Sequence, residues 1–158
     1  MKRLYQFIIL IIILFANQTK AQITTHPMLH IGYVYQNQNF GEVGGRLLFL
    51  SNDDVLYRMG ASALMGSTDS KFVIMPKVQG DILFNFEKNV DFYHSYYFLV
   101  GAEATNKYIA PKAGLSLFGI MDITAGYAFS INQKGIYDKE LKGFNLNFTF
   151  NIPLVMVR

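Results

Sequence analysis

The chain contains no cysteine among its 158 residues, which excludes a disulfide scaffold, a thiolate metal site, a cysteine nucleophile and a lipidated N-terminal cysteine. Charged residues are also scarce, at 16% of the chain against about 25% in an ordinary soluble domain. Apolar types reach 51%, which argues against intrinsic disorder. The composition therefore predicts one folded domain and argues against a conventional water-soluble one.

The first 21 residues have the three-part pattern of a secretory signal peptide. Lys2 and Arg3 form a basic start, residues 7–16 (FIILIIILFA) are an apolar run, and residues 19–21 (TKA) place small residues at a cleavage site. A membrane-spanning helix needs about 20 apolar residues, so a run this short favours cleavage over anchoring. We expect residues 1–21 to be a cleaved signal peptide and residues 22–158 to form the mature domain.

Removal of that segment changes the charge balance. Three of the 14 basic residues, Lys2, Arg3 and Lys20, lie in it with no acid, so eleven basic and eleven acidic residues remain. The mature chain is therefore neutral, and it has no basic surface of the kind that binds nucleic acid. We expect no nucleic-acid partner.

Apolar and polar residues alternate with period two through most of the mature chain. From Phe144 to Met156 the even positions are apolar, while the odd positions begin with Asn145, Asn147 and Thr149. Alternation of this length predicts a strand with one apolar face, and no mature segment has a convincing helical period. The sequence predicts an all-β domain of eight strands, at residues 28–36, 40–50, 55–65, 72–86, 92–105, 108–118, 120–131 and 143–156.

The direction in which the polar face points decides the class of barrel. A soluble barrel has its apolar face inside, and a membrane barrel has it outside. Gly and Ser are frequent on the polar face, and they suit the cramped interior of eight strands better than a water-facing surface. We expect the charged residues of this face to form an interior ionic network, because buried charges must pair. These residues are Glu42, Arg46, Arg58, Lys77, Asp81, Glu103, Lys112 and Asp122.

The opposite face is apolar and carries no charge in mid-strand. Rings near both ends of spanning strands are typical of the interfacial girdles of a membrane barrel. A soluble sandwich core also favours Phe and Tyr, so aromatic content alone leaves that alternative open. The aromatic residues near expected strand ends are Tyr33, Tyr35, Phe40, Phe49, Tyr57, Phe72, Phe84, Phe86, Phe92, Tyr127, Phe129 and Phe144.

The mature chain resembles the small eight-stranded outer-membrane β-barrel proteins of Gram-negative bacteria. The resemblance rests on the export signal, the lack of cysteine, the eight alternating segments, and the strand-like segments 108–115 (YIAPKAGL) and 122–129 (DITAGYAF). It implies a closed antiparallel up-and-down transmembrane β-barrel in the cell outer membrane, with a plugged lumen and both termini in the periplasm. It also implies a monomer without a cofactor, whose partners are outer-membrane lipid and the outer-membrane assembly machinery.

Two features depart from that pattern. The family's last strand usually ends in an aromatic residue, whereas residues 153–158 here read PLVMVR. Pro76, Pro111 and Pro153 lie inside expected strands, where each removes a backbone hydrogen-bond donor. We expect bulges or strand ends at these prolines.

Residues suited to catalysis or metal binding are few. His26 precedes the first strand, His30 falls on the polar face, where it could join the ionic network, and His94 falls on the apolar face. The histidines do not combine, so we expect no metal site. The expected outer rim lacks histidine, so we also expect no catalytic site. Its polar residues are Ser67, Asp69, Ser70, Asp138 and Glu140.

Three functions remain open on these observations. The first is an integral outer-membrane barrel with a plugged ionic interior, a structural or surface-contact role and no catalysis. The second is a narrow pore for ions or small solutes, which needs a continuous water path that eight strands rarely leave. The third is a secreted or periplasmic soluble β-barrel that binds a lipid or another apolar ligand inside.

Overall fold

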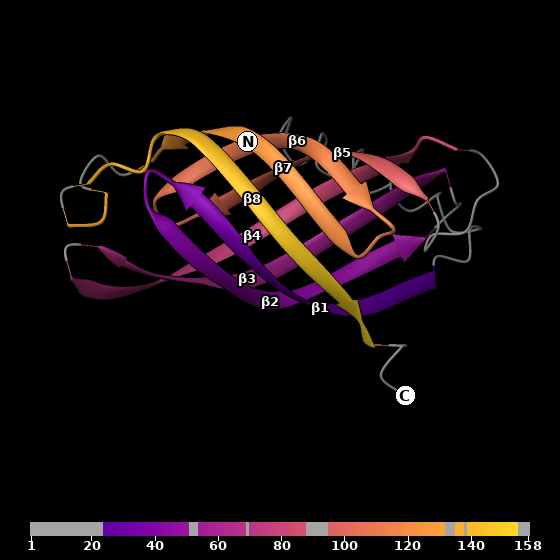
Figure 1. The fold of residues 1–158 in the computed structure, drawn as a ribbon, viewed down its shortest axis with the longest axis horizontal. Helices are drawn as coiled ribbons and strands as arrows, with labels where there is room; N and C mark the ends of the chain where they lie inside the picture. The colour runs from indigo at the N-terminus through magenta and orange to yellow at the C-terminus, as the bar shows by residue number, and fades with distance from the viewer. Residues whose placement is uncertain are drawn as a thin grey trace, which may run out of the picture.

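The chain folds into one closed antiparallel up-and-down barrel of eight strands in the computed structural model. The alternating pattern predicts the eight strands, and the resemblance to small outer-membrane barrels implies their closure. The structure describes residues 24–50, 54–68, 70–87, 95–131, 135–137 and 139–154. Each strand pairs with the next, and β8 pairs with β1 to close the sheet (Figure 1). No helix in this part of the chain is long and apolar enough to cross a membrane. The strands are β1 Thr24–Gln36, β2 Asn39–Leu50, β3 Val55–Thr68, β4 Lys71–Asn85, β5 Tyr96–Thr105, β6 Tyr108–Leu117, β7 Met121–Ser130 and β8 Gly143–Pro153.

The barrel has two distinct ends. The hairpin end, at the left of Figure 1, carries the β1–β2, β3–β4 and β5–β6 turns and the β7–β8 connection. The terminal end carries the β2–β3, β4–β5 and β6–β7 connections, together with the described start of β1 and the end of β8. These two names are kept below.

Several strand ends differ from the sequence prediction. β1 begins at Thr24 rather than at residue 28, and β5 begins at Tyr96 rather than at 92. β3 does not end at residue 65 as expected, because residues 66–68 continue the strand and pair with β4. The pattern hid this extension, since Gly, Ser and Thr in a row resemble a turn. β8 ends at Pro153, and residues 155–158 lie outside the described part.

The register is constant along every ladder, so none of the ladders contains a bulge. Successive partners across the sheet lead from His26 once around the barrel to Gln36, ten residues further along β1. A displacement of ten residues over eight strands corresponds to a strand tilt of about 40°. The path runs through Leu48, Arg58, Asp81, Gly101, Lys112, Gly126 and Asn145.

The prolines interrupt ladders without shifting them. The β6–β7 ladder lacks pairs for Ala110 and Pro111 and resumes at Lys112 in the same register, so the expected bulge there is absent. Pro76 pairs with Ala63 of β3, and the pairing of β4 with β5 begins only at the next residue. Pro153 is the last residue of β8, as expected for a strand end. Each proline therefore lies where one ladder is open, since its ring leaves no N–H to donate.

The outside of the barrel is apolar and the inside holds the charges. Thirty large apolar side chains are exposed in the described part, and Met59 and Ile74 are each 62% exposed. Every charged residue of the strands is buried except Lys71, the first residue of β4. Phe40 is an error of the sequence prediction: it lies inside at 1% exposure, because it shares the inward phase of Glu42 on β2. Phe92 lies outside the described residues.

The close approach of β6 to β7 makes Gly114 sensitive to substitution. A Cβ at Gly114 would meet the backbone oxygen of Ile123, whereas a Cβ at the outward Gly80 would meet nothing within 4 Å. We expect Gly114→Ala to lower the free energy of unfolding by about 1–3 kcal/mol through overpacking, and Gly80→Ala to change it little. Urea unfolding in detergent micelles measures both values, and equal effects would contradict the strand spacing described here.

Candidate functional site

The eight charged residues of the inward face project into the middle of the lumen. They come from six consecutive strands, β2 to β7, and their exposed fractions lie between 1% and 5%. Each alternates along its strand with outward apolar residues, so the period of two that forms the strand also places the charge inside. The members are Glu42 and Arg46 of β2, Arg58 of β3, Lys77 and Asp81 of β4, Glu103 of β5, Lys112 of β6 and Asp122 of β7.

The part of the network toward the terminal end centres on Asp122. An Arg46 Nη1 to Asp122 Oδ2 distance of 2.7 Å joins β2 to β7 across the lumen. Arg58 lies 2.8 Å from Asp122 Oδ2 and 3.2 Å from Asp81 Oδ2. The Asn151 amide donates to Asp122 at 2.9 Å and accepts from Arg46 at 2.9 Å. Two arginines and an amide therefore neutralise this carboxylate.

The part toward the hairpin end centres on two glutamates. Lys77 Nζ lies 2.8 Å from Glu42 Oε2 and 3.3 Å from Glu103 Oε2. Ser62 donates to Glu42 at 2.7 Å. The Tyr108 hydroxyl and the Asn145 amide donate to Glu103 Oε1 at 3.0 and 3.1 Å. Neutral donors thus occupy the carboxylate oxygens that the lysine does not reach.

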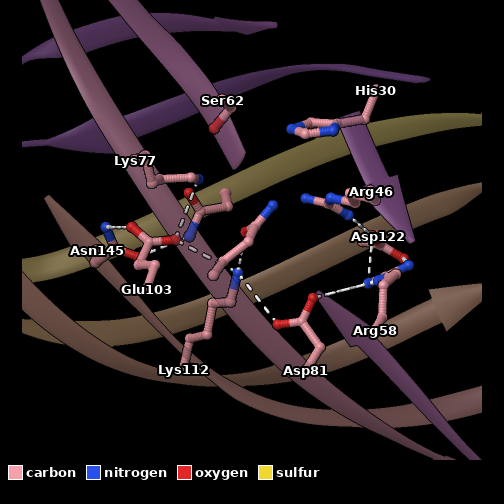
Figure 2. A network of polar contacts seen from close by, with 12 residues as sticks. His30, Arg46, Arg58, Ser62, Lys77, Asp81, Glu103, Lys112, Asp122 and Asn145 are labelled. Carbon is pink, nitrogen blue, oxygen red and sulfur yellow. Dashed lines mark hydrogen bonds and ion pairs between the residues drawn. The ribbon is translucent and has the colours of Figure 1, made fainter. Parts of the chain in front are cut away.

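Lys112 joins the two parts into one chain of alternating sign, and Figure 2 shows it between Asp81 and Glu103. Its Nζ lies 3.4 Å from Asp81 Oδ1 and 3.4 Å from Glu103 Oε2, and it donates to Gln79 at 2.7 Å. Each acid in this chain contacts a base on either side, apart from Glu42 at its end. In order the chain runs Arg46, Asp122, Arg58, Asp81, Lys112, Glu103, Lys77 and Glu42.

Neutral polar residues complete the network. His30 Nε2 lies 3.0 Å from Glu42 Oε1, so His30 extends the chain beyond its last acid. Asn145 and Asn151 also belong to the network, although the alternation by itself does not assign them to it. The alternation does show that both residues occupy inward positions of β8. It cannot identify their partners on β5, β2 and β7, because the pairing of strands is not readable from one sequence. His94 lies outside the described residues.

Apolar side chains fill the lumen on both sides of the charges. Toward the hairpin end, a cluster includes Val34, Phe40, Leu64, Met75 and Tyr108. Toward the terminal end, a second cluster contains Met28, Leu48, Leu56, Leu83, Tyr97 and Leu99. The interior thus consists of an ionic layer between two apolar layers, which the sequence analysis did not anticipate. Apolar layers of this kind favour exclusion of water and raise the strength of each ion pair between them.

The arrangement is suited to holding the barrel together. Bases and neutral donors surround the carboxylates, and no group of three or more His, Asp or Glu residues in the described ranges could hold a metal ion. Of the expected rim residues, Ser67, Ser70 and Glu140 are exposed, and Asp69 and Asp138 lie outside the described part. Tight pairing of this kind stabilises structure and occupies the carboxylates of the network.

Comparison with known proteins gives no assignment: no family model, no curated protein and no solved structure matches the chain.

Removing one base from the network should leave the negative charge of a buried carboxylate without enough neighbouring positive charge. We expect Arg58→Ala and Lys112→Ala each to lower the free energy of unfolding by about 3–5 kcal/mol. Lys142→Ala, at an exposed position on the hairpin end, serves as the control and should change it by less than about 0.5 kcal/mol. Urea unfolding followed by circular dichroism measures all three, and silent Arg58 and Lys112 variants would contradict the network.

Proposed function

We propose that this protein is an integral outer-membrane β-barrel with a sealed ionic interior and a structural or surface-contact role, without catalysis. One observation carries the proposal: in the described strands the charged side chains lie inside, except Lys71 at a strand end, while large apolar side chains cover the outside. This distribution is the reverse of a soluble barrel and is typical of strands that contact lipid.

The distribution of rings on the outer surface supports the same function. On β4, Phe72 and Phe84 are exposed at 67% and 42%, near opposite ends of the strand. Twelve residues of a strand tilted by about 40° span about 30 Å along the barrel axis, which is close to the hydrocarbon thickness of a bilayer. Similar rings lie near the hairpin end at Tyr33, Tyr35, Tyr127, Phe129 and Phe144, and near the terminal end at Tyr57, Phe86, Tyr96 and Phe98.

The location and partners of the protein follow from this proposal. Export through the segment 1–21 and insertion by the outer-membrane assembly machinery would bring residues 22–158 to the outer membrane as a monomer. The described exterior offers its apolar surface to membrane lipid, which is then the main partner.

A soluble carrier of an apolar ligand is a weaker candidate. Such a barrel needs an apolar cavity within, yet the middle of this lumen holds eight paired charges and both flanking layers hold packed apolar side chains. Its thirty exposed apolar side chains would also meet water, and patches larger than a few hundred Å² are rare on soluble monomers.

An arginine substituted on the outer surface tests whether that surface faces lipid or water. Val43 lies near the middle of β2 at 45% exposure, and Ile131 follows β7 at 58% exposure. In lipid vesicles we expect Val43→Arg to lower the free energy of unfolding by about 2–4 kcal/mol and the control Ile131→Arg by about 0–1 kcal/mol. Urea titration of vesicle-reconstituted protein measures both. If both arginine variants fold as well as the parent protein and remain soluble without detergent, the membrane proposal is wrong.

The two apolar layers disfavour conduction through the lumen. We expect the reconstituted barrel to give no discrete current steps in planar bilayers, because each layer is a dewetted barrier to ions. Single-channel recording tests this, with a known porin added afterwards to show that the bilayer reports channels. Regular steps from the purified barrel would favour the narrow pore instead.

A further inference from the structure

The two rims of the barrel differ in charge. In the described part, the hairpin end carries four lysines and one acid, whereas the terminal end carries Asp54 and Glu87. The four described lysines are Lys71, Lys107, Lys139 and Lys142.

A groove of about 370 Å³ lies at the basic rim. Its walls are residues 72–74 of β4, Lys107 of the β5–β6 turn, and residues 135–137 of the β7–β8 connection. Phe72 and Ile74 are exposed at 67% and 62%, so one wall continues the apolar outer surface. Lys107 contributes a cation to another wall. The groove thus crosses from the apolar belt to the charged rim.

Hydrogen bonds hold the outer wall of this groove beside the barrel. Asn37 Nδ2, in the β1–β2 turn, donates to the backbone oxygen of Lys142 at 2.6 Å and to that of Glu140 at 3.4 Å. Ile136 and Lys139 exchange two backbone hydrogen bonds of 3.0 Å. Lys71 Nζ lies 4.7 Å from the centroid of the Tyr137 ring, which links the wall to β4. The connection is therefore closed on itself by the Ile136–Lys139 pair and is held to the barrel by Asn37 and Lys71.

We infer that this groove binds the phosphate-bearing headgroup of an anionic membrane lipid. Lys107 and the neighbouring Lys71 supply positive charge for the phosphate, while Phe72, Ile74 and Tyr137 contact the first part of the acyl chains. Charge complementarity selects the ligand, because a cation beside an apolar wall matches an amphiphile with an anionic head. The inference rests on the membrane placement proposed above, and it adds a lipid class and a location.

The absence of tryptophan allows a site-specific test. Phe72→Trp places a single fluorophore at the groove, and Phe84→Trp places one near the other end of β4. Each protein is reconstituted in vesicles that contain brominated phosphatidylglycerol or brominated phosphatidylcholine at equal mole fraction, since bromine quenches a nearby indole. We expect the groove reporter to prefer phosphatidylglycerol, and the Phe84 reporter to show no preference.

Lysine substitutions then test the origin of the preference. In the Phe72→Trp background we expect Lys107→Gln and Lys71→Gln each to lower the relative affinity for phosphatidylglycerol by about fivefold. Lys142→Gln, on the same rim but not among the groove-lining residues, is the matched control and should lower it much less.

The outcomes separate this inference from the proposed function. A preference at the groove alone, lost on removal of Lys107 and Lys71, supports the lipid site. Equal quenching of both reporters by both lipids, or an equal preference at both reporters, overturns the site and leaves the membrane barrel intact. If neither lipid quenches either reporter, the membrane placement itself is overturned.

Discussion

Everything inside this barrel depends on the alternation of sign along one chain of eight buried charges. A single buried charge costs several kcal/mol, and that cost is offset only when opposite charges and neutral hydrogen bonds surround it. Each inner member here lies between two charges of opposite sign, and each end has a further hydrogen-bond partner, Asn151 at Arg46 and His30 at Glu42. Sliding one strand by a single residue would turn its charges outward, so the network also fixes the register.

The size of the lumen and the length of the charged side chains match because neighbouring inward positions are small. A Cβ at Gly60 would come within 2.7 Å of Cγ of Arg46, so glycine there leaves room for the arginine stem. Aliphatic and aromatic side chains occupy the lumen on the hairpin side and on the terminal side of the charges. The interior is therefore a filled core of three layers, as the geometry of eight strands requires.

Much of this architecture is readable from local pattern. Alternation predicted the eight strands and the eight residues found at the centre, because period two fixes which face a residue occupies. The antiparallel closure of the barrel was implied by the resemblance to small outer-membrane barrels. The apolar interior layers were not predicted. Residues such as Leu48 and Leu99 lie between outward apolar neighbours, so a continuous apolar stretch does not show which of its residues point inward. Phe40 was misplaced for another reason, because an aromatic side chain near a strand end resembles a girdle residue. The partners across the lumen depend on register and shear, which one sequence does not encode locally.

The contact between β2 and β7 has a kinetic consequence. Arg46 and Asp122 belong to strands separated by four others on one side of the barrel and by two on the other, so they meet only when the sheet curls shut. An open intermediate sheet would leave Asp122 without its two arginine partners, which reach it across the lumen. For a chain that inserts into a bilayer, curling and insertion must then occur together. Unfolding must also expose several charges at once, which places a high barrier in the way of spontaneous loss of the barrel.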